Sequence, residues 1–533
     1  DVFGLSPGGK YAIVKERNKN DIFSYEVATG TMRNISAGIV DSLQETDWLG
    51  SRGLGGVIAG WLGNEEAVLI YDKHDIWMME LSKQVKPVNI TKGFGRQHNI
   101  ALTLVSGGTL VQSFGRKELF YLSAFNPDTK ECGFFRTKLD NKSVIEKLSM
   151  GPYNYSISGS PYSFGSIAPV IYKAKDAGVY LLARQTATEA PNFFITRDFK
   201  TFTPVSDIHP EKEYNWYTTE LHTWTSLDGR KLQGILYKPE NFDPKKKYPV
   251  LIHYYEEKSD ALNVYITPDL YEGANIDIPT FVSNGYLVFT PDIYYTMGDA
   301  MQGTYDAVIS GANYLSELPF VDKKKMGIQG HSFGGYETNY LVTHSNIFAA
   351  ACSAAGIIDL ISGYGFMGDH GYRNQAFGEN GQNRLGASLW EAPHIYIKNS
   401  PIFSLANVTT PLLMMHTKND GACSYTGAME MFIGLRRLGK KAWMLAYEGD
   451  HAVFGKDGLD FNVRMMQFFD HYLKDKPAPV WMTQGIPAEK RGLDYGFDYD
   501  TKIKTPGKGL LTREEQNKVD SIIGRKPIVI ELK

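Results

Sequence analysis

A glycine-rich stretch near the middle of the chain places one serine where it could act as a nucleophile. Residues 330–335 read Gly-His-Ser-Phe-Gly-Gly and fit the pattern G-x-S-x-G around Ser332. The run before this stretch is typical of a strand and the run after it has helical spacing, so we expect Ser332 on a sharp strand-to-helix turn. Small flanking residues suit the crowded backbone of such a turn. The amide of Phe333 would then face the negative charge that develops when a serine attacks a carbonyl group.

A serine nucleophile needs an acid and a histidine as partners. When the serine lies on a strand-to-helix turn of this kind, the acid and then the histidine follow it along the chain. Asp420 lies in a loop after the apolar run 411–416, and His451 lies in a loop before the last long helical pattern. Loops at the carboxyl ends of neighbouring parallel strands meet at one edge of a sheet. We therefore predict that Ser332 attacks, His451 transfers the proton and Asp420 orients the imidazole. Asp450, directly before His451, is the alternative acid.

The elements that must position these residues alternate between strands and helices over residues 211–482. An antiparallel pair of strands with its turn at Asp228-Gly229 comes first. Apolar runs typical of buried strands follow at residues 248–255, 286–292, 326–332, 348–356, 411–416 and 441–447. Helical patterns cover residues 306–318, 336–344, 427–439 and 461–475. This alternation predicts an α/β-hydrolase fold with a doubly wound, mostly parallel sheet.

The first 210 residues are predicted to be all-β. Short alternating runs recur between Gly, Pro, Asn and Asp clusters, in four units spaced roughly 40 to 50 residues apart, which is the length of a four-stranded propeller blade. We predict a β-propeller over residues 1–210, with a β-sandwich or an irregular β domain as the alternative. Propellers have about 4 to 8 blades. Because the chain starts within a unit, we expect the C-terminal blades of an incomplete propeller rather than a complete small one.

The two ends of the chain carry little chemistry. The sequence starts with Asp1 rather than Met and shows no signal-peptide pattern, so we expect a fragment or a processed product. Residues 483–533 are charged and rich in turn formers, and we predict that they form a C-terminal extension.

Composition argues against several classes of function. The net charge is −3 and no long basic run is present, so no nucleic-acid partner is predicted. No apolar stretch reaches about 18 residues, so no membrane span is predicted in this chain. The three cysteines are far apart and match neither zinc spacing nor a disulfide framework. The glycines near Ser332 lack the Lys-Ser/Thr of a phosphate loop. We therefore predict no metal and no cofactor.

A predicted propeller followed by a hydrolase with G-x-S-x-G-G-Y resembles the prolyl oligopeptidase family of serine peptidases, including its dipeptidyl peptidase and glutamyl-endopeptidase-like branches. The resemblance implies a serine peptidase with oligopeptide substrates, because the propeller of this family excludes larger ones. It also implies that a tyrosine helps to bind the oxyanion. An ungapped match from Tyr248 puts Tyr255 in that role, beside the amide of Phe333, with Tyr254 as the alternative.

The substrate pocket implied by the resemblance departs from the family pattern. Aromatic residues normally line the proline pocket, but the matching positions here are Ile357, Leu360, Gly363 and Met367. The acid loop has alanine at position 422 where dipeptidyl peptidases carry asparagine, and Cys423 beside it is a further candidate for substrate contact. A preference for proline is therefore in doubt. Two further residues could pair with an acidic substrate side chain or serve as structural ion-pair partners, namely Arg373 and Arg384.

Two other functions are compatible with the same residues. An esterase or another acyl hydrolase would use the same triad, and a catalytically silent protein could act as an interaction component of a cell-envelope complex. The segment 477–488 resembles endings of bacterial family members, which implies a periplasmic or cell-envelope location, with the cytoplasm as the alternative. A homo-oligomer or an envelope complex is the expected assembly.

Overall fold

The computed structural model describes residues 2–16, 21–39, 43, 57–105, 113–139, 144–157, 169–367, 374–490 and 492–501. The chain divides into two compact units. Unit 1 contains residues 1–209 together with residues 260–265, and unit 2 contains residues 210–259 and 266–533. No helix in the part of the chain that the structure describes combines the length and the apolar character needed to cross a membrane.

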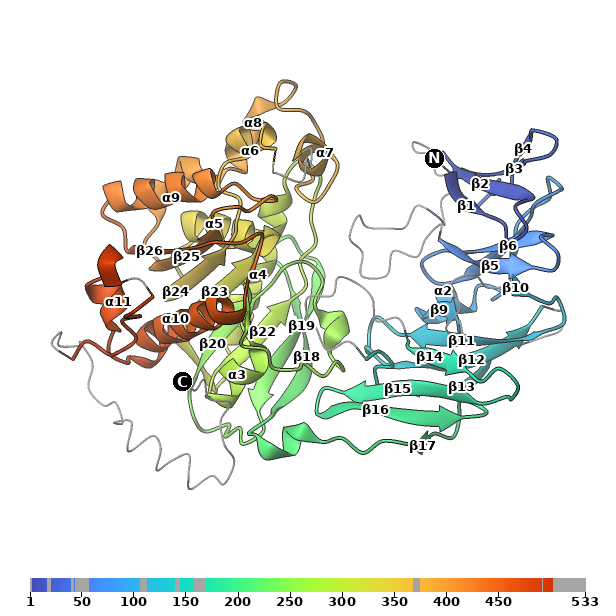
Figure 1. The fold of residues 1–533 in the computed structure, drawn as a ribbon, viewed down its shortest axis with the longest axis horizontal. Helices are drawn as coiled ribbons and strands as arrows, with labels where there is room; N and C mark the ends of the chain where they lie inside the picture. The colour runs from blue at the N-terminus through green and yellow to red at the C-terminus, as the bar shows by residue number, and fades with distance from the viewer. Residues whose placement is uncertain are drawn as a thin grey trace. The chain divides into compact units, whose positions relative to one another are not determined.

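Unit 1 is all-β, as predicted, and its described residues form four sheets (Figure 1). The first sheet has the order β1 (Val2–Leu5), β2 (Tyr11–Lys15), β3 (Ile22–Glu26) and β4 (Thr31–Asn34). The second has the order β10 (Ser113–Phe114), β5 (Ile58–Leu62), β6 (Ala67–Tyr71), β7 (Ile76–Glu80) and β8 (Val88–Asn89). The third has the order β13 (Glu146–Gly151), β12 (Cys132–Lys138), β11 (Leu119–Phe125) and β9 (Ala101–Leu104). The fourth has the order β14 (Ile171–Lys173), β15 (Tyr180–Thr186), β16 (Glu189–Thr196) and β17 (Thr203–Pro204).

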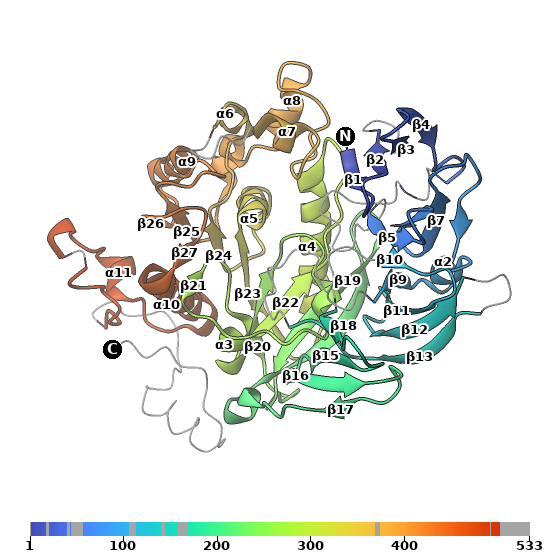
Figure 2. The same cartoon turned by 45° about the vertical axis from the view of Figure 1, so that its right-hand side comes forward.

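Consecutive sheets of unit 1 pack against each other through shared apolar clusters, and Figure 2 shows them following one another in chain order. Tyr11 of the first sheet and Val68 of the second belong to one cluster. A second cluster joins the second and third sheets, and a third joins Phe134 of the third sheet to Leu182 of the fourth. Apart from the parallel pair β10–β5, neighbouring strands are antiparallel. Stacked antiparallel sheets are what propeller blades require, and closure of a propeller stays a prediction.

Unit 2 has the predicted α/β-hydrolase fold. Its sheet has the order β18 (Tyr217–Thr225), β19 (Lys231–Pro239), β22 (Leu287–Pro291), β20 (Tyr248–His253), β23 (Val321–His331), β24 (Ala350–Ala354), β25 (Leu412–Thr417) and β26 (Ala442–Tyr447). The pairs β18–β19 and β19–β22 are antiparallel, and the remaining neighbours are parallel. Every residue of β22, β24 and β25 is buried, which explains why these strands are mostly apolar and do not alternate between apolar and polar residues.

Helices cover both faces of this sheet (Figure 1). One face packs against α3 (Ile278–Ser283) and α10 (Gly455–Lys474), whose rings of Phe281 and Phe469 lie 6.2 Å apart. The other face shares a single apolar cluster with α4 (Ala300–Ser316), α5 (Phe333–His344) and α9 (Tyr425–Arg437). The long spacing between strands β24 and β25 contains α6 (Leu360–Tyr364), α7 (Asn374–Glu379), α8 (Pro393–Lys398) and η3 (Pro401–Asn407).

The remaining elements of the chain are short. A two-stranded sheet pairs β21 (Glu272–Gly273) with β27 (Val453–Phe454), just after the loop that contains His451. The other short helices are α2 (Phe94–His98), η1 (Pro210–Glu213), η2 (Ser259–Ala261), α11 (Val480–Thr483) and η4 (Ala488–Lys490). Most of the predicted C-terminal extension lies outside the described residues, so its character stays a prediction.

Candidate active site

Ser332 occupies a strained turn between strand β23 and helix α5. Its φ of 59° and ψ of −117° lie in a region that residues with a side chain rarely adopt. The turn is held from outside, because the backbone N–H of Ser332 donates to the carbonyl of Ala354 at 2.9 Å. Strain of this kind persists only where the surrounding structure enforces it, and it is common at functional sites. The turn therefore presents the hydroxyl of Ser332 at the carboxyl end of the central strand.

The glycines around Ser332 are required by close backbone packing. A Cβ atom at Gly330 would lie 2.2 Å from the carbonyl oxygen of Gly334. A Cβ atom at Gly334 would lie 2.7 Å from the carbonyl oxygen of Tyr254, and one at Gly335 would lie 2.4 Å from that of Ala354. Real Cβ atoms do not approach backbone atoms this closely. The motif is thus a steric requirement of the turn and of the helix packed behind it.

Replacing Gly330 by alanine is expected to destabilise unit 2 by about 3 kcal/mol, because the nearest atoms are backbone and cannot rotate away. The free energy of unfolding from urea titrations measures this effect. Gly427→Ala is the matched control, because a Cβ atom there would meet only the Cβ of Ser424 at 3.9 Å, and its expected effect is within about 1 kcal/mol. Equal stability of the two variants would contradict the steric argument.

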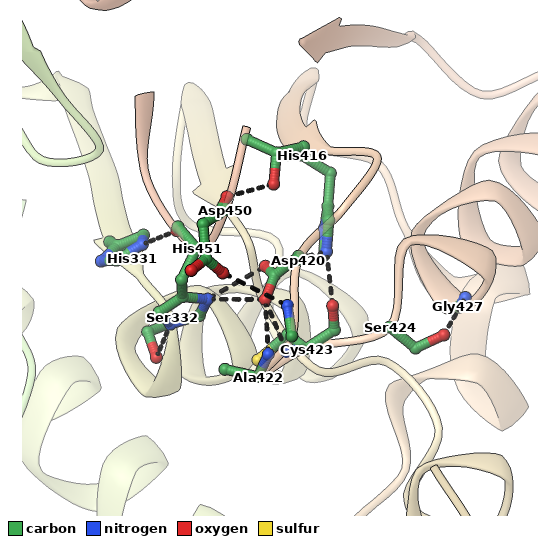
Figure 3. A network of polar contacts seen from close by, with 12 residues as sticks. His331, Ser332, His416, Asp420, Ala422, Cys423, Ser424, Gly427, Asp450 and His451 are labelled. Carbon is green, nitrogen blue, oxygen red and sulfur yellow. Dashed lines mark hydrogen bonds and ion pairs between the residues drawn. The ribbon is translucent and has the colours of Figure 1, made fainter. Parts of the chain in front are cut away.

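The structure brings the three residues of the predicted triad into one chain of hydrogen bonds (Figure 3). The Nε2 atom of His451 lies 2.7 Å from the Oγ of Ser332. The Nδ1 atom of His451 lies 3.0 Å and 2.9 Å from the two carboxylate oxygens of Asp420. Because a carboxylate accepts, Nδ1 carries the hydrogen, and a neutral His451 then has a free lone pair on Nε2 for the serine proton. The carboxylate of the alternative acid, Asp450, instead accepts a hydrogen bond from the backbone N–H of Gly421 at 3.4 Å.

The surroundings of Asp420 strongly favour the ionised form of its carboxyl group. Burial by itself raises the pKa of the carboxyl, but hydrogen bonds from His416, His451 and the amide of Cys423 outweigh it and hold the pKa well below the ordinary value. The amides of Ala422 and Cys423 both donate to Oδ1 at 2.8 Å. A carboxylate held by several donors stays ionised and keeps its orientation. Ala422 and Cys423 thus contribute their backbone to the acid loop, and the thiol of Cys423 has its pKa raised by burial.

Tyr255, and not Tyr254, reaches the serine. The hydroxyl of Tyr255 hydrogen-bonds the side chains of Gln382 and Ser332, and burial raises its pKa to about 12, so the hydroxyl keeps its proton. Tyr254 is fully buried, and its hydroxyl lies 2.9 Å from the Oγ1 of Thr338 on helix α5. The first amides of a helix lack intrahelical acceptors, which leaves the amide of Phe333 suited to bind an anion. The hydroxyl of Tyr255 and this amide flank the same serine.

The predicted substrate-binding residues have different surroundings. Leu360 is buried and Ile357 is half-buried, and both belong to the apolar cluster that contains Phe333. The side chain of Met367 is 71% exposed. Arg373 lies outside the described residues. Arg384 is buried, and its guanidinium pairs with the carboxylate of Glu256 at 3.0 Å. Of the two roles considered for this arginine, the contact corresponds to a structural ion pair.

Two histidines that the sequence did not single out hold the loops of the site. His331 donates from Nε2 to the backbone carbonyl of His451 at 2.8 Å (Figure 3). His416 donates from Nε2 to the carbonyl of Cys423 at 3.0 Å, and the same nitrogen lies 3.3 Å from Asp420. The only signal in the sequence was position: one histidine directly precedes the nucleophile, and the other lies four residues before the acid. Buried histidines are usually interpreted as packing residues, so this signal was weak.

Acid is expected to destabilise unit 2 because two of its histidines resist protonation. Desolvation lowers the pKa of His331 and of His253 from 6.5 to about 3. Between pH 6.5 and pH 3 the unfolded chain therefore binds more protons than the folded chain, and stability falls as the pH decreases. His331→Gln should flatten this fall by about 1.4 kcal/mol per pH unit within the window. Urea midpoints at several pH values measure the slope, and the exposed His394→Gln serves as the control. An unchanged slope in His331→Gln would contradict this assignment.

Comparisons with known proteins agree with this architecture. Residues 285–476 match the sequence profile of the prolyl oligopeptidase family. The chain is 27% identical over 250 residues to the uncharacterised peptidase YuxL of Bacillus subtilis, covering 44% of this chain and 36% of that protein. It is 23% identical over 267 residues to dipeptidyl-peptidase 5 of Porphyromonas gingivalis, covering 47% of this chain and 37% of that protein. The matched region thus spans little more than a third of the length of these relatives.

Among solved structures, a putative dipeptidyl aminopeptidase IV from Bacteroides ovatus is similar to this chain with a TM-score of 0.64 at 16% identity. The match covers 88% of this chain and 66% of that one, and at this identity it concerns the fold alone. The predicted family is confirmed by the sequence match, which includes Ser332, Asp420 and His451 within its range. Residues 285–476 of the chain therefore form a domain of the prolyl oligopeptidase family.

Proposed function

We propose that this protein is a serine peptidase that hydrolyses oligopeptides through an acyl-enzyme intermediate. The observation that carries the proposal is the chain of hydrogen bonds from Ser332 through His451 to Asp420, within a domain of a peptidase family. The buried, ionised Asp420 keeps the hydrogen of His451 on Nδ1. Nε2 can then take the proton of Ser332 as the hydroxyl attacks the scissile carbonyl.

The two donors beside Ser332 suit the charge that develops in this attack. The carbonyl oxygen becomes an oxyanion, which the amide of Phe333 and the hydroxyl of Tyr255 would bind in the tetrahedral intermediate. His451 then gives its proton to the leaving amine, and the peptide remains esterified to Ser332. A water molecule, activated by the same imidazole, hydrolyses this ester and restores the free serine. No step needs a group other than the residues named and water.

The apolar cluster next to Ser332 indicates the substrate side chain that the site would prefer. Phe333 and Leu360 belong to this cluster, together with the half-buried Ile357. An apolar wall of this kind favours contact with an apolar substrate side chain over a charged one. The guanidinium of Arg384 is already paired with Glu256, which makes it a poor partner for an acidic substrate. We therefore propose substrates with an apolar residue before the cleaved bond.

The experiment that tests the proposal combines labelling with substrate profiling on the complete protein. A fluorophosphonate should form an adduct that mass spectrometry maps to Ser332, and a peptide library should be cleaved after apolar residues. Hydrolysis of small esters without any peptide cleavage would indicate an acyl hydrolase of another kind. The absence of both an adduct and hydrolysis would indicate a catalytically silent protein.

A further inference from the structure

One buried acid lies close to the candidate active site and has no part in the chemistry above. Glu337 is in helix α5, five residues after Ser332, and its side chain has no exposed surface. Its Oε1 atom lies 2.8 Å from the hydroxyl of Tyr295 and 2.8 Å from the hydroxyl of Thr304. Its Oε2 atom has no hydrogen-bond partner among the described residues. An ionised carboxylate with one oxygen buried without a donor is costly.

The hydrogen bonds around Tyr295 require a proton on Glu337. The hydroxyl of Tyr295 lies 2.6 Å from the backbone carbonyl of Tyr255, and a carbonyl can only accept. The single hydrogen of Tyr295 must therefore point to that carbonyl. The contact of 2.8 Å between Tyr295 and Glu337 then needs a hydrogen from Glu337, which only a neutral carboxylic acid supplies. With an ionised Glu337, one of these two contacts would bring oxygen atoms together with no hydrogen between them.

The burial of Glu337 favours the same protonation state. Burial, with a smaller contribution from the carboxylate of Glu256, raises the pKa of Glu337 well above the ordinary value, against the effect of Arg384 and of the two hydroxyl groups. The guanidinium of Arg384 is engaged by Glu256 at 3.0 Å and lies 4.3 Å from the ring centre of Tyr295. Lys258 is the other cation near these acids, and burial lowers its pKa to about 8. Burial likewise raises the pKa of Tyr295, which keeps its hydroxyl protonated.

We propose that Glu337 is a protonated positioning residue that fixes Tyr255 through Tyr295. The acid donates to the Tyr295 hydroxyl, which donates to the Tyr255 carbonyl, and this holds the hydroxyl of Tyr255 next to Ser332. The role in turnover rests on the proposed peptidase function. The protonation of Glu337 does not, and it can be measured separately. In this arrangement the helix that begins at the nucleophile also holds the second oxyanion donor.

The test compares substitutions that keep or remove the donor. Glu337→Gln retains an N–H donor toward Tyr295, so its kcat should stay within about 3-fold of the parent. Glu337→Leu and Tyr295→Phe lack the hydrogen bond and should lower kcat by up to about 10²-fold with little change in KM, since losing one oxyanion donor costs about 10²–10³-fold. Tyr255→Phe sets the upper limit for the decrease in kcat, because it removes the oxyanion donor itself. The double variant Glu337→Leu/Tyr255→Phe should therefore be no slower than Tyr255→Phe alone.

Infrared spectroscopy tests the protonation without activity. The carbonyl stretch of a neutral carboxylic acid should be present at pH 8 in the parent protein and absent from Glu337→Gln. Absence of this band in the parent would overturn the proposal. A decrease in kcat of Glu337→Gln as large as that of Tyr295→Phe would also overturn it. Additive losses in the double variant would also overturn it. If Glu337→Leu does not fold, the comparison of Glu337→Gln with Tyr295→Phe gives the same decision. A parent protein with the band but without hydrolysis would refute the peptidase function alone.

Discussion

Ser332→Ala is expected to lower kcat for peptide hydrolysis by about 10⁶-fold and to abolish the fluorophosphonate adduct. The substitution removes the attacking oxygen, and no other group in the proposed mechanism can form the acyl-enzyme. The backbone of the turn should be unaffected, because it is held by the amide of Ser332 and by the flanking glycines rather than by the hydroxyl. Mass spectrometry of the labelled protein and progress curves with a cleaved library peptide measure both effects.

Two controls make this result specific. Ser316→Ala removes a hydroxyl that donates to the carbonyl of Asn313 within helix α4, and the variant should keep both the adduct and the rate. The unfolding free energy of Ser332→Ala should stay within about 1 kcal/mol of the parent. An adduct that persists in Ser332→Ala, or hydrolysis at the parent rate, would show that another residue is the nucleophile.

His451→Ala is expected to have an effect of similar size, about 10⁶-fold in kcat, because without the imidazole no base takes the proton from Ser332. The side chain of His451 makes its hydrogen bonds to Ser332 and Asp420, so the variant should remain folded. The double variant Ser332→Ala/His451→Ala should be no slower than either single variant, because residues that act as one unit do not contribute additively. Steady-state kinetics of the three proteins measure this pattern.

The control for this series is His98→Ala, which removes an exposed histidine from helix α2 of unit 1. Its kcat should equal that of the parent. A near-normal rate in His451→Ala would remove this residue from the triad. Losses that multiply in the double variant would show that Ser332 and His451 act in separate steps.

The elbow and the meeting of Ser332, Asp420 and His451 could be predicted because their requirements are local. A tight turn leaves room only for glycine at positions such as 330 and 335, and the acid and the histidine follow parallel strands whose carboxyl ends share one edge of the sheet. The choice between Tyr254 and Tyr255 was less accessible. Strand β20 ends at His253, so the alternation of side chains no longer applies to the residues that follow. Only the contacts of the folded chain separate the two tyrosines.

The supporting residues could not be predicted, because their roles come from contacts across long sequence distances. His331 bonds a residue 120 positions later, and Glu337 bonds Tyr295, 42 positions earlier. In the sequence, both look like polar residues within buried elements. The pairing of β10 with β5 was likewise inaccessible, because a strand of two residues carries no periodic signal. Such residues are identified by their burial and by assigning a hydrogen to each hydrogen bond, and both steps require the folded structure.

The division into units has a consequence for dissecting the protein. The chain passes from one unit to the other after residues 209, 259 and 265, so neither unit is a single continuous segment. In unit 1, Lys130 forms an ion pair with Asp260 at 3.1 Å. The side chain of Gln185 accepts a hydrogen bond from the backbone N–H of Tyr265 at 2.7 Å. A fragment that begins at residue 210 would carry the segment 260–265 without these partners, and would expose the now buried side chain of Tyr265. We therefore expect the complete chain to give a more soluble protein than a fragment that begins at residue 210.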